Sequence, residues 1–237
     1  MSTVNAGWRG PSIVTDGLII NLDANSGTSY SPYTSGVTWK DLSNNGNNAT
    51  LVNGPIYTTA NGGGIVFDGV DDRANISISL DFNSRGFTHE CVFNLTSNPS
   101  TWPDYRNLFG FNASSLSTFY GILIERDSRG IRLDIPDTVN TRYGYTTSYA
   151  PVTGSNYHFA WTWLNGLFTA YMNGALIGSS NVGSYTAKAT TQLILGYAAF
   201  SPKYFYGNHF IDRIYNRVLT AQEIQQNFNG SRARFGL

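Results

Sequence analysis

The segment from Tyr157 to Gly178 constrains the fold of this chain more than any other. It contains three runs of strand-forming residues, which the dipeptides Asn165-Gly166 and Asn173-Gly174 separate. Asn-Gly accepts the positive φ angles of a type I′ turn, which joins neighbouring antiparallel strands through two residues. The segment therefore predicts a three-stranded antiparallel meander.

Side-chain type alternates along the first of these three strands. Because successive residues of a strand point to opposite faces, every second residue shares a face. One face carries four large aromatic side chains, those of Tyr157, Phe159, Trp161 and Trp163. We expect this face to lie in the core. The same rule applied to residues 87–95 groups His89 and Cys91 with apolar residues, so we interpret both as structural.

Short apolar runs bounded by turn residues recur elsewhere, as at 17–22, 64–67 and 76–80, and each predicts a strand. The composition agrees, because 25 glycines, 14% aromatic residues and 13% charged residues indicate turns and half-buried strands rather than long amphipathic helices. A chain of 237 residues fits one large β-sandwich. We expect an N-terminal arm or edge strand over 1–15 and a single sandwich domain over 16–237.

A helix signal stands near the C-terminus. Thr220 and Glu223 have the spacing of a capping box, and Leu219 and Ile224 occupy the positions of a hydrophobic staple. Gly230 follows as a C-terminal stop. We predict a helix over about 220–229 that is too short to be stable without docking on the sandwich.

The charge balance and the cysteine content limit which partners and which cellular compartment we expect for the protein. Fifteen basic and fifteen acidic residues cancel, so no global field favours nucleic acid or an anionic membrane. The single cysteine, Cys91, cannot form an internal disulfide. The first residues lack the pattern of a signal peptide, and no apolar run reaches the length of a membrane span. We expect synthesis in a reducing cytoplasm, without membrane insertion or nucleic-acid binding.

Four segments, read together, resemble one family pattern. They are GLIINLDA at 17–24, WKDLSNNGNNAT at 39–50, IVFDGVDD at 65–72 and IDRIYNRVLTAQEI at 211–224. The pattern is similar to that of the laminin G-like, concanavalin A-like jelly roll, and the resemblance covers residues 16–228. It implies an all-β sandwich of two antiparallel sheets, closed by one short C-terminal helix.

The ending EIQQNFNGSRARFGL at 223–237 looks like the C-terminus of laminin G-like proteins encoded by tailed bacteriophages. This resemblance implies a non-enzymatic structural protein on the virion surface, in a capsid decoration, tail or fibre. Its partners would be other virion proteins and host surface glycans. We expect it to be oligomeric on the particle, where repetition raises avidity. The alternatives are a free carbohydrate-binding lectin and a polysaccharide-active enzyme.

The acidic residues argue against an enzyme. Glycoside hydrolysis requires two placed carboxyl groups. Glutamate occurs only at positions 90, 125 and 223, and nothing resembles the Glu-x-Asp-x-x-Glu strand motif of laminarinase-like glucanases. Asp134 and Asp137 flank a proline, which is typical of turn hydrogen bonding. The three histidines, His89, His158 and His209, lack the spacing of a zinc site or a catalytic triad.

Two candidate calcium sites stand in the sequence, and no other cofactor is indicated. Asp68, Asp71 and Asp72 surround a glycine turn, where carboxylates either bind calcium or accept hydrogen bonds from the turn amides. Jelly-roll relatives hold a structural calcium ion with an aspartate of the last strand and early-chain oxygens. By that resemblance, Asp212 and Asp23 are the second candidate site.

Aromatic residues outside the clear strands are the candidate contact surface. Tyrosine and tryptophan combine an apolar face with a polar group, which suits stacking on sugars and also protein interfaces. Two loop segments are rich in such residues and supply the candidate ligand or partner contacts Trp102, Tyr105, Arg106, Tyr197, Phe200, Tyr204 and Tyr206. Both kinds of partner remain open on the sequence alone.

Overall fold

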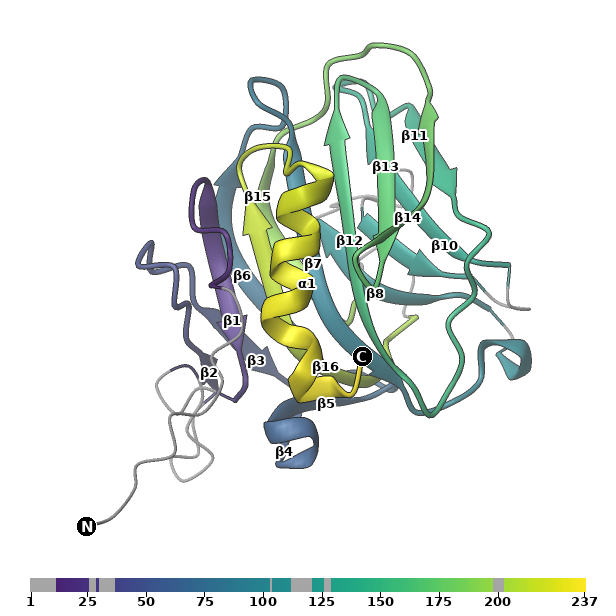
Figure 1. Ribbon diagram of the computed structural model, residues 1–237. Helices are drawn as coiled ribbons and strands as arrows, with labels where there is room; N and C mark the ends of the chain where they lie inside the picture. Colours follow the sequence, from purple (N-terminus) through teal and green to yellow (C-terminus); the bar gives the residue numbers. More distant parts are fainter. Residues whose placement is uncertain are drawn as a thin grey trace.

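The computed structural model describes residues 12–25, 29, 37–102, 104–111, 121–125, 129–197 and 203–237. Within these residues, sixteen strands form two antiparallel sheets that face each other as a sandwich, and one α-helix packs on the outside (Figure 1). The predicted all-β sandwich with a C-terminal helix is confirmed. No helix among the described residues is both long and apolar enough to span a membrane.

The helix-side sheet, which carries the helix on its outer face, has the order β14-β13-β12-β7-β16-β5-β4. Two strands share one edge of β16, because β5 pairs with its first half and β1 with its second. The strands are β1 (Leu18–Asp23), β4 (Ile56–Thr58), β5 (Gly64–Asp68), β7 (Phe87–Leu95), β12 (Asn156–Leu164), β13 (Leu167–Met172), β14 (Ala175–Asn181) and β16 (Tyr206–Tyr215).

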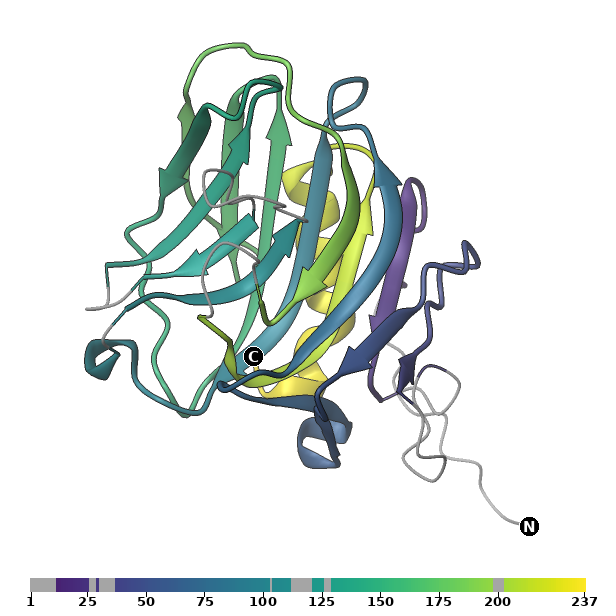
Figure 2. The same cartoon turned by 180° about the vertical axis from the view of Figure 1, so that it is seen from behind.

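The opposite sheet has the order β11-β10-β9-β8-β15-β6-β3-β2 and is seen from its outer side in Figure 2. Its strands are β2 (Thr38–Trp39), β3 (Ala49–Val52), β6 (Arg73–Leu80), β8 (Arg106–Phe111), β9 (Gly121–Ile124), β10 (Ile131–Pro136), β11 (Arg142–Thr146) and β15 (Thr190–Leu195). Two short 3₁₀ turns, η1 (Ala60–Gly62) and η2 (Pro99–Thr101), lie in the connections.

The predicted meander is formed by β12, β13 and β14. Asn165 and Gly166 adopt φ angles of 47° and 86°, and Asn173 and Gly174 adopt 51° and 76°. These positive values are the ones that a type I′ turn requires at both central residues. The local sequence therefore determines where these strands turn, and an irregularity between Ala170 and Tyr171 then shifts the register of β13 against β14.

The core between the sheets confirms the predicted faces of β12 and β7. Tyr157, Phe159, Trp161 and Trp163 all belong to the main apolar cluster, together with Cys91. His89 is fully buried and stacks on Phe109 of the opposite sheet, with ring centroids 4.1 Å apart. Both sheets thus contribute side chains to one packed layer.

The helix α1 (Ala221–Phe235) begins as predicted but ends later. Thr220 and Glu223 form the capping box, with both reciprocal hydrogen bonds present. The predicted end near residue 229 is wrong, because Gly230 lies inside the helix and Gly236 ends it with φ 67°. Phe235 in the last turn packs on Phe210, at a centroid distance of 5.2 Å. We attribute the extension to such tertiary contacts, which offset the cost of about 1 kcal/mol for an internal glycine.

The N-terminal prediction is only partly covered. Residues 1–11 of the predicted arm lie outside the described residues. Residues 12–15 contain no strand and lie against α1, where Ser12 O accepts from Gln226 and Val14 N donates to Asn227. The described part of the predicted arm therefore belongs to the interface between α1 and the sheet.

The two ends of the sandwich differ. The end called upper here, at the top of Figure 1, carries the β6–β7 connection, the Asn165-Gly166 turn and the β16–α1 connection. The lower end carries the turn at 69–72 and the chain that enters β16. The candidate sites are distributed between these two ends.

Candidate functional site

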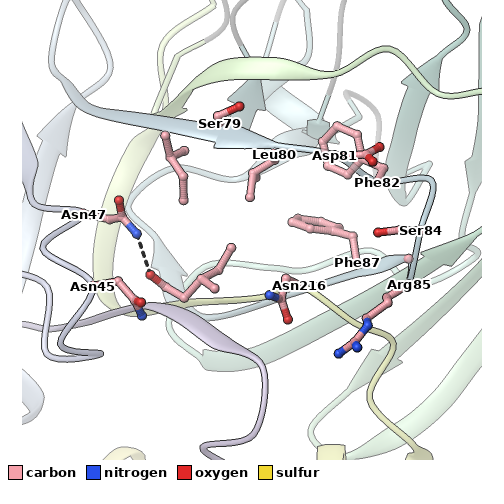
Figure 3. Close-up of a pocket in the computed structure, with 13 residues that line it drawn as sticks. Asn45, Asn47, Ser79, Leu80, Asp81, Phe82, Ser84, Arg85, Phe87 and Asn216 are labelled. Atoms are coloured by element: carbon pink, nitrogen blue, oxygen red, sulfur yellow. Dashed lines mark hydrogen bonds between the residues drawn. The ribbon is translucent and has the colours of Figure 1, made fainter.

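A cavity of about 550 Å³ opens at the upper end, beside β1, the end of β6 and the start of β7. Figure 3 shows apolar side chains around its centre and polar side chains around its margin. The apolar residues are Ile19, Ile78, Leu80, Phe82 and Phe87. The polar residues are Asn45, Asn47, Ser79, Asp81, Ser84, Arg85 and Asn216.

The aromatic part of the cavity is fixed by the core. Phe82 and Phe87 are 2% and 1% exposed and meet edge to face, with centroids 5.3 Å apart. Phe82 also contacts Phe111 of the opposite sheet at 5.1 Å. Because both rings are packed on several sides and are almost wholly buried, they hold the wall of the cavity in place but present little surface of their own to a ligand.

Two asparagines at one end of the cavity have oriented side chains. Asn47 Nδ2 donates to Ile19 O at 2.8 Å, and Asn45 Nδ2 donates to Leu18 O at 3.2 Å. A backbone carbonyl only accepts hydrogen bonds, so the nitrogen of each amide must face it. Each Oδ1 then remains available to accept a hydrogen bond from a ligand.

The loop that carries these asparagines is held by one carboxylate. Asp41 Oδ1 accepts from Asn21 N and Ser43 N, at 2.9 and 2.8 Å, and Oδ2 accepts from Asn47 N at 3.0 Å. The Ser43 hydroxyl adds a bond to Ile19 O at 3.0 Å. The loop is thereby tied to β1, and the two amides keep a fixed position.

The other end of the cavity is formed by the tight turn between β6 and β7. Gly86 has φ 70°, and a Cβ at this position would lie 2.5 Å from Trp163 O, so the turn requires glycine. Asp81 Oδ1 accepts from the backbone and side chain of Asn83, and Arg85 O accepts from Val218 N at 3.2 Å. Figure 3 shows Arg85 at the end of the cavity away from Asn45 and Asn47.

Arg85 is the basic residue among those that line the cavity, and its side chain is exposed. Asn216, also exposed, adds a second polar group near it (Figure 3). Together with the oriented asparagines and the half-buried Ile19 and Ile78, they allow a small amphipathic ligand to bury an apolar face while its polar groups form hydrogen bonds.

Two of the sequence-predicted contact residues have structural roles. Trp102 is only 5% exposed, and its Nε1 donates to Ser97 Oγ at 2.7 Å, so the expectation of an exposed stacking surface is wrong. Arg106 Nη1 donates to Gly69 O and Tyr204 O, at 3.2 and 3.1 Å. Arg106 therefore joins chain segments that are distant in sequence.

The predicted tyrosines gather at the lower end. Tyr197 and Tyr204 are half-buried and stack on each other at 4.8 Å, with Arg73 5.8 Å from the Tyr197 ring. Tyr206 lies against Gly69, because a Cβ added to Gly69 would lie 2.8 Å from the Cβ of Tyr206. Tyr105 is also half-buried. The predicted contact Phe200 lies outside the described residues.

The first candidate calcium site is a compact acidic turn. Asp68, Asp71 and Asp72 each place a carboxylate oxygen within 4.8 Å of the others. Asp68 Oδ1 accepts from Val70 N and Asp71 N, at 2.8 and 3.3 Å, and Asp72 Oδ2 accepts from Asp68 N at 2.9 Å. Burial, followed by the nearby charges of Asp68 and Asp71, raises the pKa of Asp72 to about 6.

These contacts match the turn-stabilising interpretation of the acidic segment. Two of the three carboxylates already accept backbone amides, as in an Asx turn. The oxygen chemistry also suits calcium. Calcium binding at this turn is the untested alternative, which the hydrogen bonds neither require nor exclude.

The second candidate calcium pair is not brought together. Asp23 Oδ1 accepts from Arg234 Nη1 at 2.6 Å. Asp212 lies opposite Leu22 in the ladder, so the side chain of Asp23, one residue further along β1, points to the other face of the sheet. The pairing of Asp23 with Asp212 is therefore wrong.

Asp212 instead joins two histidines in the core. Its Oδ2 lies 2.8 Å from His209 Nδ1, and its Oδ1 lies 3.3 Å from His89 Nε2. An irregularity between His209 and Ile211 shifts the register of β16, which places residues 209 and 212 on the same face. The sequence analysis assigned no contact between these residues, because a bulge breaks the simple alternation.

His89, Cys91 and Asp212 offer atoms close enough for a metal, but their hydrogen bonds oppose one. Trp161 Nε1 donates to His89 Nδ1 at 3.3 Å, so the proton of the neutral ring is on Nε2, facing Asp212. Burial lowers the pKa of His89, which keeps the ring neutral. A protonated Nε2 has no lone pair for a metal, and we interpret this group as a hydrogen-bonded core cluster.

The acidic residues considered for catalysis have separate partners. Asp134 is fully buried between Arg132 Nε at 2.9 Å and Arg142 Nε at 3.3 Å. Asp137 Oδ1 accepts from Val139 N and Thr141 N, at 3.0 and 2.7 Å, as expected for a turn. Each carboxylate is thus engaged in local structure.

Solved structures share this fold at low sequence identity. The binding domain of Paraclostridial Mosquitocidal Protein 1 is 16% identical, with a TM-score of 0.71, over 91% of this chain and 52% of that one. The botulinum neurotoxin serotype D binding domain is 12% identical, with a TM-score of 0.70, over 92% and 52%. Trypanosoma rangeli sialidase in complex with the inhibitor DANA is 16% identical, with a TM-score of 0.66, over 94% and 36%.

The chain spans about half of the two toxin domains and about a third of the sialidase. No curated protein matches the sequence. A laminin G-type family model, described as the concanavalin A-like lectin/glucanases superfamily, matches residues 68–225. That match extends from the end of β5 into α1 and covers more than half of the chain. Together with the two-sheet antiparallel sandwich, it shows that this chain belongs to the concanavalin A-like lectin/glucanase superfamily.

Proposed function

We propose that this chain is a non-enzymatic carbohydrate-binding domain and that the cavity at its upper end is the saccharide site. The observation that carries the proposal is the pair of oriented asparagines, Asn45 and Asn47, at the edge of a preformed cavity. Fixed acceptors suit a ligand whose surface is rich in hydroxyl donors, and the half-buried side chains of Ile19 and Ile78 offer apolar surface to the C–H face of a sugar ring.

The size and position of the cavity agree with this role. Its volume of about 550 Å³ falls within the range of roughly 300 to 1,000 Å³ that is usual for small-molecule sites. It lies at an end of the sandwich where strand connections meet, and such connections often carry binding residues on a rigid scaffold. A mono- or disaccharide unit is the class of ligand that fits.

The structural neighbours support a binding role without specifying the ligand. Two of them are named as binding domains of protein toxins, and the sialidase is described in complex with an inhibitor. A shared fold alone does not transfer function. The proposal therefore depends on the cavity, and the neighbours supply context.

The partners of the acidic residues support the non-enzymatic part of the proposal. Glu90 is buried beside Arg213, Glu223 closes the helix cap, and Asp134 lies between two arginines. None of these three carboxylates lines the cavity. Asp81 does line it, and one of its oxygens is bonded to Asn83.

A glycan array followed by calorimetric titration of the bound saccharides tests the proposal. We expect Asn45→Ala and Asn216→Ala each to weaken binding about fivefold, the effect of losing one hydrogen bond of about 1 kcal/mol. Asn229→Ala on α1, which does not line the cavity, is the matched control and is expected to bind as the wild type does. Absence of binding to all glycans would overturn the proposed function, and release of glycan products would overturn its non-enzymatic part.

We further propose that the domain acts on the surface of a tailed-phage particle, as a capsid decoration or a tail or fibre component. The resemblance of residues 223–237 to phage-encoded laminin G-like proteins supports this setting. Many copies on one particle would convert weak saccharide contacts into avidity. Mass spectrometry of purified particles tests it: detection in stoichiometric amounts supports the virion role, whereas absence would favour the free lectin.

A further inference from the structure

A second cavity, of about 640 Å³, opens at the upper end beside the Asn165-Gly166 turn. Three chain segments supply its walls, namely the end of β12 with the turn, the β6–β7 connection and the connection from β14 to β15 (Figure 1). The lining residues are Asn83, residues 163–165 and residues 184–186. Its volume, like that of the first cavity, falls within the range that is usual for small-molecule sites.

The β6–β7 connection lies between the two cavities. Asn83 lines the second cavity, and the next two residues, Ser84 and Arg85, line the first. The side chains of these three residues are exposed. Gly86 of the first cavity touches the wall of the second, because a Cβ added to Gly86 would lie 2.5 Å from Trp163 O and 3.2 Å from Leu164 Cβ. The cavities are therefore neighbours, and an extended ligand can reach from one into the other across this connection.

Hydrogen bonds hold the connection between the cavities in place. Asn83 Oδ1 accepts from Ala187 N at 2.7 Å, and its Nδ2 donates to Ala187 O and to Asp81 Oδ1, both at 3.0 Å. Two residues further on, Arg85 O accepts from Val218 N at 3.2 Å. The connection is thus tied to the β14–β15 connection and to the chain after β16. A ligand that crosses it meets a preformed surface, so little ordering of the loop opposes binding.

The second cavity offers surface that suits a sugar ring. Leu164 is 43% exposed, and Tyr185 is half-buried, with its ring stacked on Tyr143 at 4.2 Å. Trp163 is fully buried and only supports the wall. The exposed polar residues are Asn83, Asn165, Ser184 and Thr186. Their amides and hydroxyls both donate and accept, so they suit sugar hydroxyls of any configuration. The second cavity therefore bears on the length of the saccharide and not on the identity of its units.

We infer that the ligand is an oligosaccharide of about three or more units that occupies both cavities and crosses the β6–β7 connection. One unit lies in each cavity, and the chain between them passes over residues 83–85. Because the units are covalently linked, binding in the first cavity makes binding in the second intramolecular, which raises the overall affinity. This inference rests on the proposed carbohydrate-binding function and specifies the length of its ligand.

Calorimetric titration with saccharides of increasing length tests the inference. The probes are malto-, cello- and N-acetylchito-oligosaccharides of one to four units, together with fragments of the same lengths from any other glycan bound on the array. In a series that binds, we expect the tetrasaccharide to bind about tenfold or more tightly than the monosaccharide. We expect Leu164→Ala to weaken tetrasaccharide binding about fivefold and to change monosaccharide binding by less than about twofold. Asn45→Ala, in the first cavity, should weaken binding at every length. The matched control is Leu176→Ala, an exposed leucine on β14 that lines neither of the two cavities.

The outcomes separate this inference from the broader function. Equal affinity at all lengths, or unchanged tetrasaccharide binding by Leu164→Ala, would overturn the two-cavity assignment and leave saccharide binding intact. Failure of every saccharide on the array and in titration would overturn both. Leu164 is partly exposed and alanine keeps its Cβ, so the variant is expected to fold with an unchanged melting temperature.

A measurement on the wild type makes the test independent of the variant. Backbone amide shifts of residues 163–165 and 184–186, around the second cavity, are expected to change with the tetrasaccharide and not with the monosaccharide. Shifts at these residues that stay unchanged with a bound tetrasaccharide would overturn the inference.

Discussion

The side-chain nitrogen of Asn227 lies 2.8 Å from Oε2 of Glu90 and donates a hydrogen bond between α1 and β7. Glu90 is fully buried and also accepts from Arg213. The carbonyl oxygen of Asn227 accepts from Val14 N at 2.8 Å. One side chain thus links the helix, the sheet and the chain before β1, so the helix is positioned by polar contacts as well as by its apolar face.

Asn227→Ala is therefore expected to lower the free energy of unfolding by about 2 to 3 kcal/mol, because it leaves a buried carboxylate and a buried amide short of partners. Urea denaturation measures the change. Gln225→Ala, at an exposed position on the same helix, is the control and should alter stability by less than about 0.5 kcal/mol. A loss below 1 kcal/mol for Asn227→Ala would show that the helix does not depend on this bond.

Glu90 predicts a specific loss of stability in acid. Burial alone would raise the pKa of Glu90, but the charges of His158 and Arg213 outweigh it and lower the pKa to about 2, from an ordinary value of 4.5. Because the folded-state pKa is depressed, this contribution is fully present above about pH 4.5 and is lost as the pH falls toward 2. Urea denaturation at pH 6 and at pH 3 measures how much the free energy of unfolding changes between the two conditions. We expect this change to be smaller for Glu90→Gln than for the wild type. Equal differences would contradict the assignment.

The variant Trp102→Ala tests whether Trp102, at the lower end, stabilises the core or binds a saccharide. The side chain is buried in the main core, so its truncation is expected to cost about 3 to 5 kcal/mol of unfolding free energy. Saccharide affinity per folded molecule should not change, because Trp102 does not line the cavity. A variant of normal stability that loses glycan binding would restore the original expectation of a stacking surface.

We predict that the stability of the protein responds to substitution in the acidic turn and does not respond to calcium. Asp68→Ala removes the acceptor of two turn amides and should lower the free energy of unfolding by about 1 kcal/mol. The melting temperature of the wild type should be the same with calcium and with a chelator. A rise of several degrees with calcium would instead assign the three carboxylates to a bound ion.

Much of the fold follows from local sequence rules. The two Asn-Gly turns, the aromatic face of β12 and the capping box at Thr220 each depend on neighbouring residues, and the structure confirms them. The end of α1 did not follow, because contacts such as that of Phe235 with Phe210 compete with the local preference of Gly230. Propensity therefore predicted where the helix begins better than where it ends.

The candidate site was harder to predict. Asn45 and Asn47 read as turn residues in the sequence, and only the fold brings them near Arg85 and Phe87. Trp102 lies in a segment without strand periodicity, but a long-range fit buries it in the core. Loop residues carry little information about burial when their neighbours come from distant strands. Aromatic content alone pointed to the lower end of the sandwich, whereas the cavity that we propose as the saccharide site lies at the upper end.

The most direct test of the account is a map of backbone amide chemical shifts in the ¹⁵N-labelled protein during titration with a bound saccharide. We predict that the largest changes cluster at residues 45–47, 78–87 and 216, around the cavity at the upper end. Changes confined to the tyrosines of the lower end, Tyr197, Tyr204 and Tyr206, or no changes at all, would contradict the assignment of the saccharide site.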